Sequence, residues 1–368
     1  QATKLDIGIV LTAHPTEVKR RTLIQKYANL IEIMEQRHLY KKYPSKIIEL
    51  DRKLYSEIAI IWKTDELKRT KPSPLDEARW GLAVIEDSLW DTIPKVYKRL
   101  NDIFRKNLKK DLPRDFNPIQ FGSWMGGDRD GNPNVTAEVT KKVLLFSRWQ
   151  AAKLYDKELT KLIQDLSMEE CSTKIKKVTG NSFEPYRVFL RPIRDKVRLT
   201  HQLIENHLNN NSHLDEKKLI QNKYEITLPL REVRNSLKLN REDHIANADL
   251  LDLMRRVRCF GINLARLDIR QEADRHSKLL NELFRKKYNI KYNSLSEKEK
   301  IKLLNKLIKE KKCFVDRIKI TNKENKEVWN TFKQISKTPN ECLGAYVISM
   351  TSTASDILSV YFYKYKQK

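Results

Sequence analysis

One histidine stands where a short apolar run ends and a basic helix is expected to begin. His14 follows the strand-like run Ile7–Leu11, is flanked by Pro15, and precedes the basic residues at 19–21. A neutral imidazole at such a junction can transfer a proton, and the neighbouring cations attract an anionic substrate. A structural interpretation also fits, in which a threonine caps the helix and the histidine only packs. The spacing alone leaves both open.

Glycine is scarce in this sequence except in one short window. The chain has nine glycines, about 2% against a usual ~7%. Four of them lie close together, at Gly122, Gly126, Gly127 and Gly131. Such a cluster indicates a loop that needs unusual backbone angles or a close approach to a ligand. The same window holds the polar and aromatic candidates Trp124, Asp128, Arg129 and Asn132.

This window does not fit a calcium loop of the EF-hand type. Pro133 occupies the position where that loop needs glycine, and Val139 stands where its bidentate glutamate belongs. We favour a rigid loop in which backbone N–H groups and Arg129 face an anion while Trp124 excludes water. A purely structural turn, with Asp128 and Arg129 paired internally, explains the same residues.

A second charged pattern follows a later apolar run. Arg266, Asp268, Arg270 and Glu272 alternate along an extended segment, so their side chains share one face. Four charges on one face are costly in a dry core unless they are paired or wetted. A guanidinium suits bidentate binding of phosphate or carboxylate, which predicts an anion site. An internal Arg–Asp lattice is the other interpretation, and the two are compatible.

The rest of the chain predicts the elements that position these residues. Amphipathic helices are expected over 21–37, 76–90, 140–167, 185–208, 249–258 and 273–287. Short strand-like runs at Ile7–Leu11, Ile119–Phe121, Ile262–Leu267 and Ala345–Met350 each pass directly into a polar turn. Functional residues just after strand ends are typical of a β/α barrel. We therefore predict a mostly α-helical protein with a TIM-type β/α barrel core, about four of its eight strands, and large helical insertions.

Composition excludes some classes of protein. The 368 residues carry a net charge of +25, and 40% are hydrophobic, which allows a real core. The longest apolar runs are far shorter than the roughly 20 residues that span a bilayer, so we expect no membrane segment. Four scattered cysteines and no recognisable leader favour a reduced, cytoplasmic protein. Much of the positive excess lies in 284–327, which we interpret as a Lys-rich peripheral insertion.

Several motifs, in this order, resemble phosphoenolpyruvate carboxylase. The strongest are Leu11–Glu17 (LTAHPTE) and Ser123–Asn134 (SWMGGDRDGNPN). Further matches are Thr64–Glu66, Pro72–Pro74, Asp76–Ala78, Glu86–Trp90, Asp268–Glu272 and Tyr346–Met350. The resemblance covers nearly the whole chain, and it implies that 1–368 is a partial carboxylase domain containing half of the barrel.

The resemblance implies a reaction and roles for the candidate residues. The family converts phosphoenolpyruvate and bicarbonate to oxaloacetate and phosphate with Mg²⁺ or Mn²⁺, usually as a homotetramer. By resemblance, His14 assists carboxylation of the enolate, Arg270 contacts the substrate phosphate, and Trp124 with the Gly126–Asn132 loop shapes the bicarbonate pocket. Arg266 is added as a further substrate-binding candidate from the charged strand.

The sequence also departs from the family pattern. Ser352 and Ala354 stand where the family has Lys and Pro, and Gly122 stands where it has Thr. The family's metal-binding carboxylates lie beyond Lys368, so we expect no metal ligands in this chain and no activity from it alone. One alternative is an inactive split-gene remnant that serves as a structural partner. A basic nucleic-acid-binding helical protein is another, although the lysines are spread over most helices without a binding motif.

Overall fold

The computed structural model describes residues 4–12, 21–66, 72–113, 116–310, 315 and 318–366. The chain divides into two compact units: Ala13–Ser73, and Gln1–Thr12 together with Pro74–Lys368. Within the described residues, every helix is too short or too polar to cross a membrane.

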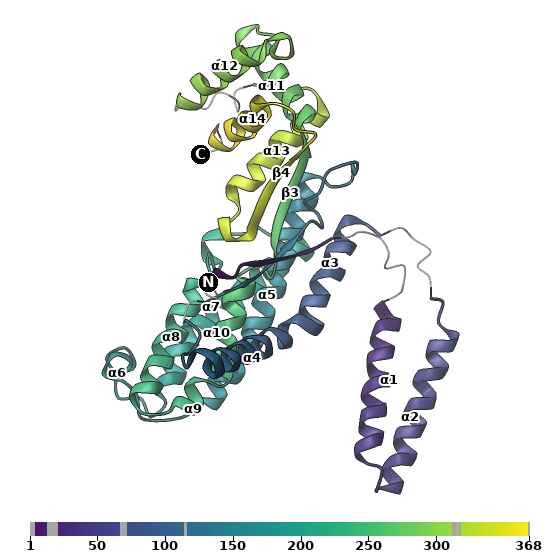
Figure 1. Ribbon diagram of the computed structural model, residues 1–368, viewed down its shortest axis with the longest axis vertical. Coiled ribbons are helices and arrows are strands. Elements are labelled where there is room, and N and C mark those ends of the chain that lie inside the picture. Colours follow the sequence, from purple (N-terminus) through teal and green to yellow (C-terminus); the bar gives the residue numbers. More distant parts are fainter. Residues whose placement is uncertain are drawn as a thin grey trace. The chain divides into compact units, whose positions relative to one another are not determined.

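The smaller unit contains an α-helical hairpin. Helix α1 (Arg21–Leu39) packs side by side with α2 (Pro44–Lys63) (Figure 1). Leu23 and Leu50 are buried between them, and Lys26 forms an ion pair with Glu57 at 3.0 Å. The periodic leucines and isoleucines at 21–37 therefore form a helix, as the sequence predicted.

The larger unit is mostly helical and contains one sheet. Its strands are β1 (Ile7–Leu11), β2 (Ile119–Ser123), β3 (Arg266–Glu272) and β4 (Leu343–Ser349). Its α-helices are α3 (Pro74–Val84), α4 (Trp90–Leu108), α5 (Ala137–Asp165), α6 (Thr173–Thr179), α7 (Pro185–Asn210), α8 (Tyr224–Leu239), α9 (Asp243–Ala246), α10 (Asp249–Phe260), α11 (Ala273–Tyr288), α12 (Glu297–Lys309), α13 (Lys323–Lys337) and α14 (Ala354–Lys366). A π-helical turn, η2 (Ile85–Leu89), joins α3 to α4, and short 3₁₀ turns are η3 (Glu216–Lys218), η4 (Tyr292–Ser294) and η6 (Asn340–Cys342).

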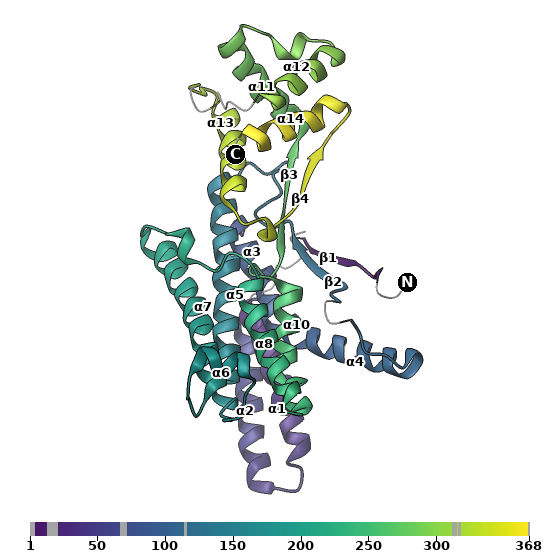
Figure 2. The same ribbon diagram turned by 90° about the vertical axis from the view of Figure 1, so that its left-hand side faces the viewer.

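All described strand pairs are parallel, and the strands lie in chain order, β1-β2-β3-β4 (Figure 2). Ile7 pairs with Ile119, Gly122 with Arg266, and Leu267 with Leu343. Long helical segments connect these strands, as parallel pairing requires. The predicted helical fold with a parallel sheet is confirmed, whereas closure of the sheet into a barrel stays a prediction.

Two predicted boundaries were wrong. The helix expected over 76–90 does not end at 90, because η2 and α4 continue the helical run to Leu108, with Pro94 inside α4. Proline there cannot donate to the carbonyl of Trp90, four residues earlier; the guanidinium of Arg256 donates to that carbonyl instead, at 2.9 Å. The strand expected at 262–267 begins at Arg266 and includes the charged residues through Glu272.

An aromatic cluster joins the sheet to the helices. Phe121 of β2 stacks on Phe260 of α10 at 5.3 Å, and Phe260 stacks on Trp90 of α4 at 5.4 Å. Trp90 also contacts Tyr155 of α5 at 5.2 Å. These large rings bury much apolar area, so they hold β2 firmly where its following loop begins.

The segment 284–327 contains buried side chains as well as lysines. Phe284, Tyr292, Leu304 and Leu307 belong to one hydrophobic cluster that also includes Phe362 of α14. The predicted status of this segment as a peripheral insertion stays a prediction.

Candidate active site

The exposed face of β3 carries the charged residues. Burial alternates along the strand: Leu267, Ile269 and Gln271 are buried, whereas the intervening charged side chains are half-buried or exposed. The predicted alternation is confirmed. Of the four charged residues, Arg266 is exposed and lies opposite Gly122 in the parallel register.

The loop after β2 runs alongside β3. Two glycines of the loop, Gly126 and Gly127, stand where a side chain would not fit. The N–H of Arg129 donates to the carbonyl of Arg270, and the N–H of Arg270 donates to the carbonyl of Gly127, both at 3.0 Å. A Cβ at Gly127 would overlap the carbonyl oxygen of Asp268. Gly126 has φ +79° and lies against Val143, which also excludes a side chain. The unusual backbone angle expected of this glycine cluster is confirmed at Gly126, whereas the close approach at Gly127 is to β3, and an approach of the loop to a ligand stays a prediction.

Arg270 is the centre of a charged cluster on this face. Its guanidinium pairs with Asp128 at 3.4 Å and with Asp130, and it lies 5.8 Å from the ring centroid of Trp124. The side chain keeps 31% exposure, which leaves it accessible to a ligand. Two carboxylates and an aromatic face hold the guanidinium in one orientation. The structure thus brings Arg270, Trp124 and Asp128 together.

Asp268 connects Trp124 to the next strand. Its Oδ2 accepts a hydrogen bond from the indole N–H of Trp124 at 3.1 Å, and its Oδ1 accepts one from the N–H of Ala345 at 2.8 Å. A Cβ at Gly344 would overlap the same carboxylate. Asp268 therefore fixes the tryptophan ring relative to both β3 and β4.

Arg129 supports the loop from inside. It is 2% exposed, and its guanidinium donates to the carbonyl of Gly127 at 2.9 Å and to the hydroxyl of Thr140 at 2.6 Å. Thr140 in turn donates to the carbonyl of Gly126 at 2.7 Å. Burial lowers the pKa of Arg129. Its assignment to substrate stays a prediction, because these contacts direct it towards α5.

Several backbone N–H groups of the loop have internal acceptors. Those of Gly127 and Asp128 donate to the carbonyl of Trp124, and that of Asp130 donates to the side chain of Asp128. That of Asn132 donates to the carbonyl of Arg129. These four N–H groups are engaged within the loop, and the expectation that N–H groups of the loop face an anion stays a prediction.

The structure gives fewer contacts for the remaining candidate residues. The side chain of Asn132 accepts from the N–H of Asn134 at 3.0 Å, which stabilises the end of the loop. Arg266 lies on the same face as Arg270, four residues earlier. His14 lies outside the described residues.

Three residues that contribute to this site were not among the predicted site residues. Asp130 pairs with Arg270, Asp268 orients Trp124, and Thr140 anchors the loop to α5. Asp130 lies in the glycine-rich motif and Asp268 in the charged strand, so their charge and position could have identified them as site residues. Thr140 offered no such signal, because a threonine in the first turn of a helix is common.

The described residues do not fit a divalent metal ion. In that part of the chain, no three His, Cys, Asp or Glu side chains are grouped closely enough to hold one. The carboxylates of Asp128 and Asp130 are both engaged by Arg270. No step involving a metal is derived from these residues.

Comparisons with known proteins identify the family. The family model for phosphoenolpyruvate carboxylase matches residues 1–367. The chain belongs to this family. Among curated relatives, the phosphoenolpyruvate carboxylase of Shewanella oneidensis is 43% identical over 360 residues, and that of Vibrio vulnificus is 40% identical over 359 residues. These alignments cover 97% of this chain but only 40% and 41% of the relatives. The family uses a divalent metal.

Proposed function

We propose that this chain supplies the substrate-binding side of a phosphoenolpyruvate carboxylase active site, within a complete protein that converts phosphoenolpyruvate and bicarbonate to oxaloacetate and phosphate. The observation that carries the proposal is the placement of Arg270 against Trp124 and two carboxylates, in motifs shared with the family. Both substrates are anions, and a fixed guanidinium is suited to bind them.

Arg270 binds the phosphate of the substrate. A guanidinium has five N–H donors, and among the described residues two of its donors reach Asp128 and Asp130. The other donors remain for phosphate oxygens, while the carboxylates hold the plane of the guanidinium. Such prior orientation reduces the reorganisation that accompanies charge development in the transition state.

Trp124 and the Gly126–Asn132 loop shape the bicarbonate pocket. The ring of Trp124 is fixed by Asp268 and covers one side of Arg270, where it excludes water. Exclusion of water protects the carboxyphosphate that forms when bicarbonate attacks the phosphoryl group, and it strengthens the electrostatic contacts. Carboxyphosphate then breaks down to carbon dioxide and phosphate. The enolate released in the first step captures that carbon dioxide to give oxaloacetate, with His14 assisting.

The remaining parts of this proposal concern the complete protein. Metal ligands come from chain outside residues 1–368, and the four parallel strands form half of a β/α barrel. The complete protein is a cytoplasmic homotetramer, and residues 1–368 alone are inactive.

The test is the activity of the complete natural protein. We expect oxaloacetate formation, coupled to NADH oxidation through malate dehydrogenase, to require both phosphoenolpyruvate and bicarbonate. His14→Asn abolishes oxaloacetate formation, whereas His38→Asn, in an exposed position on α1, leaves it unchanged. Absence of activity in the native protein would reject the enzyme and favour a remnant that acts as a structural partner. Full activity in His14→Asn would remove the histidine from its role.

A further inference from the structure

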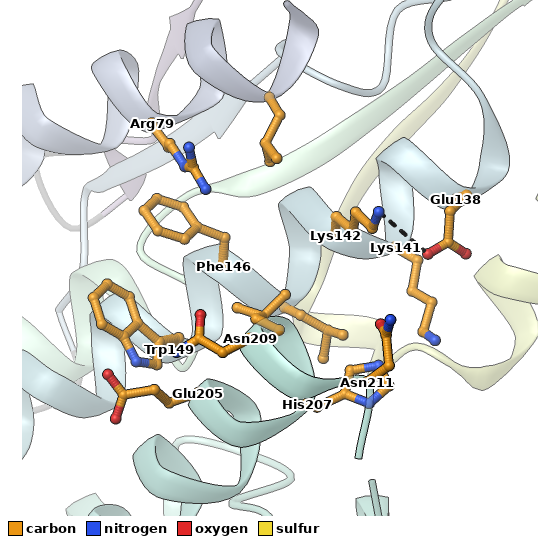
Figure 3. A pocket seen from close by; sticks show the side chains of 13 residues that line it. Arg79, Glu138, Lys141, Lys142, Phe146, Trp149, Glu205, His207, Asn209 and Asn211 are labelled. Carbon is orange, nitrogen blue, oxygen red and sulfur yellow. Dashed lines mark ion pairs between the residues drawn. The ribbon is translucent and has the colours of Figure 1, made fainter. Parts of the chain in front are cut away.

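A pocket lies in the larger unit away from the charged face of β3. It has a volume of about 380 Å³ and is lined by side chains from α3, α5 and the C-terminal end of α7 (Figure 3). None of its lining residues belongs to the candidate active site. Its volume falls within the range of small-molecule sites, about 300–1,000 Å³.

One wall of the pocket is aromatic. Phe146 and Trp149 stand three residues apart on α5, so they share one face of that helix. Their rings stack with centroids 5.4 Å apart and planes at 24°. Trp149 also stacks on His201 of α7 at 5.2 Å, which holds the indole in place. Both rings remain half-exposed, so they offer an apolar aromatic surface against which a planar ligand can pack.

Cations surround this wall. The guanidinium of Arg79, from α3, lies 5.4 Å from the ring centroid of Phe146. Figure 3 shows the two side chains next to each other. Lys141 and Lys142 add two ammonium groups from α5. Neighbouring carboxylates neutralise two of these cations only weakly. Arg79 lies 3.8 Å from Asp76, and Lys142 lies 3.9 Å from Glu138. All four side chains are more than 40% exposed, so solvent screens both ion pairs.

The combination of a stacking wall and weakly neutralised cations defines a ligand class. We propose that this pocket binds an organic anion that carries a flat ring, with the size and charge of a nucleoside monophosphate. The ring packs against the half-exposed sides of Phe146 and Trp149, and the anionic group is held by Arg79 and the two lysines. Glu205, at the other side of Trp149 in Figure 3, disfavours a second anionic group there and accepts a hydrogen bond from an amino group on the ring.

Binding of adenosine 5′-monophosphate to the complete natural protein, measured by isothermal titration calorimetry, tests the proposal. We expect one site per chain with a dissociation constant of about 0.1–1 mM. Adenosine, which lacks the anion, and inorganic phosphate, which lacks the ring, should each bind at least about ten-fold more weakly. Equal binding of phosphate alone would overturn the role of the aromatic wall.

Variants locate the site. Arg79→Gln and Phe146→Leu should each weaken binding about ten-fold, equivalent to about 1.4 kcal/mol. Arg105→Gln, at an exposed position on α4, is the matched control and should bind normally. Lys141→Gln removes one of the ammonium groups proposed to hold the anion, so it should also weaken binding, and it serves as a third variant if Phe146→Leu fails to fold. Absence of saturable binding, or binding that none of the pocket variants weakens, overturns the proposal. Carboxylase turnover is measured separately, so the failure of either proposal leaves the other intact.

Discussion

The indole N–H of Trp124 donates a hydrogen bond to Oδ2 of Asp268 at 3.1 Å, although the two residues are separated by 144 positions in the chain. The other oxygen of the same carboxylate accepts from the backbone of β4. The carboxylate of Asp268 therefore sets the position of the Trp124 ring that covers Arg270. It connects the loop after β2 to both β3 and β4.

Asp268→Ala should disturb both the fold and the site. Removal of the carboxylate leaves two N–H donors without this acceptor, which costs about 1–3 kcal/mol of the free energy of unfolding. Trp124 then loses its fixed orientation, so we expect kcat/KM for phosphoenolpyruvate to fall at least about ten-fold, or 1.4 kcal/mol. Urea titration and steady-state kinetics check these values.

The conservative variant separates orientation from charge. Asp268→Asn keeps one acceptor oxygen and should recover most of the lost stability. Asp274→Ala, an exposed position at the start of α11, is the control and should change stability by less than about 0.5 kcal/mol. If Asp268→Ala and the native protein have the same free energy of unfolding, the carboxylate of Asp268 does not connect Trp124 to β4.

Gly127→Ala should displace the loop from β3. The added Cβ would overlap the carbonyl of Asp268, which is backbone and cannot rotate away. We expect a loss of about 1–3 kcal/mol in the free energy of unfolding, together with changed fluorescence from Trp124. Gly8→Ala is the matched control, because no described atom lies within 4 Å of its Cβ position. Equal thermal midpoints for the two variants would contradict the close approach.

Arg270→Lys should reduce activity without unfolding the protein. Lysine keeps the charge but loses the planar fork that engages two carboxylates and an anion together. We expect kcat/KM for phosphoenolpyruvate to fall about a hundred-fold, which corresponds to roughly 3 kcal/mol. Arg285→Lys, exposed on α11, should retain full activity. A normal kcat/KM in Arg270→Lys would exclude the guanidinium from phosphate binding.

His276 should make the fold sensitive to acid. Burial lowers the pKa of His276 to about 4, against a smaller opposing effect of Asp356 on α14, and its Nε2 lies 2.7 Å from the hydroxyl of Tyr346 on β4. The unfolded histidine takes up a proton near pH 6.5, whereas the folded one stays neutral, so stability falls as pH drops from 6.5 towards 4. The loss between pH 7 and pH 5 is about 2 kcal/mol.

Comparison of variants isolates this effect from other titrating groups. His276→Gln removes the titration and should lose less stability between pH 7 and pH 5 than the native protein does, measured by urea unfolding. His244→Gln, at an exposed position on α9, should behave like the native protein. The same pH dependence in all three proteins would rule out His276 as the cause.

The isolated chain of residues 1–368 should be inactive and of marginal stability. Ile7, Ile9 and Val10 of β1 are each more than 40% exposed, and no described strand pairs with the other edge of β1. Exposed edge strands with apolar side chains promote aggregation. We expect light scattering to rise on mild heating and oxaloacetate to stay undetectable. A sharp, reversible unfolding transition of a monomer, or steady-state turnover, would show that residues 1–368 fold or function on their own.

The sequence predicted those parts of the site that depend on local patterns. The alternation from Arg266 to Glu272 requires only that the segment be extended, and the glycine cluster requires only a close neighbour. The roles of Asp268 and Thr140 could not be predicted in the same way, because each depends on a partner supplied by another element. Arg129 illustrates the limit: its motif suggested an exposed cation, yet the turn directs it towards α5.

The register between the loop and β3 has a consequence for changes in chain length. The reciprocal hydrogen bonds between Gly127, Arg129 and Arg270 fix which residues of the loop lie opposite Arg270. Insertion or deletion of one residue among 124–129 would shift which amide meets Arg270 and turn Asp128 and Asp130 away from it. Directed evolution at residues 124–129 will therefore find functional variants among substitutions. Libraries that change the number of residues in this segment will give misassembled sites.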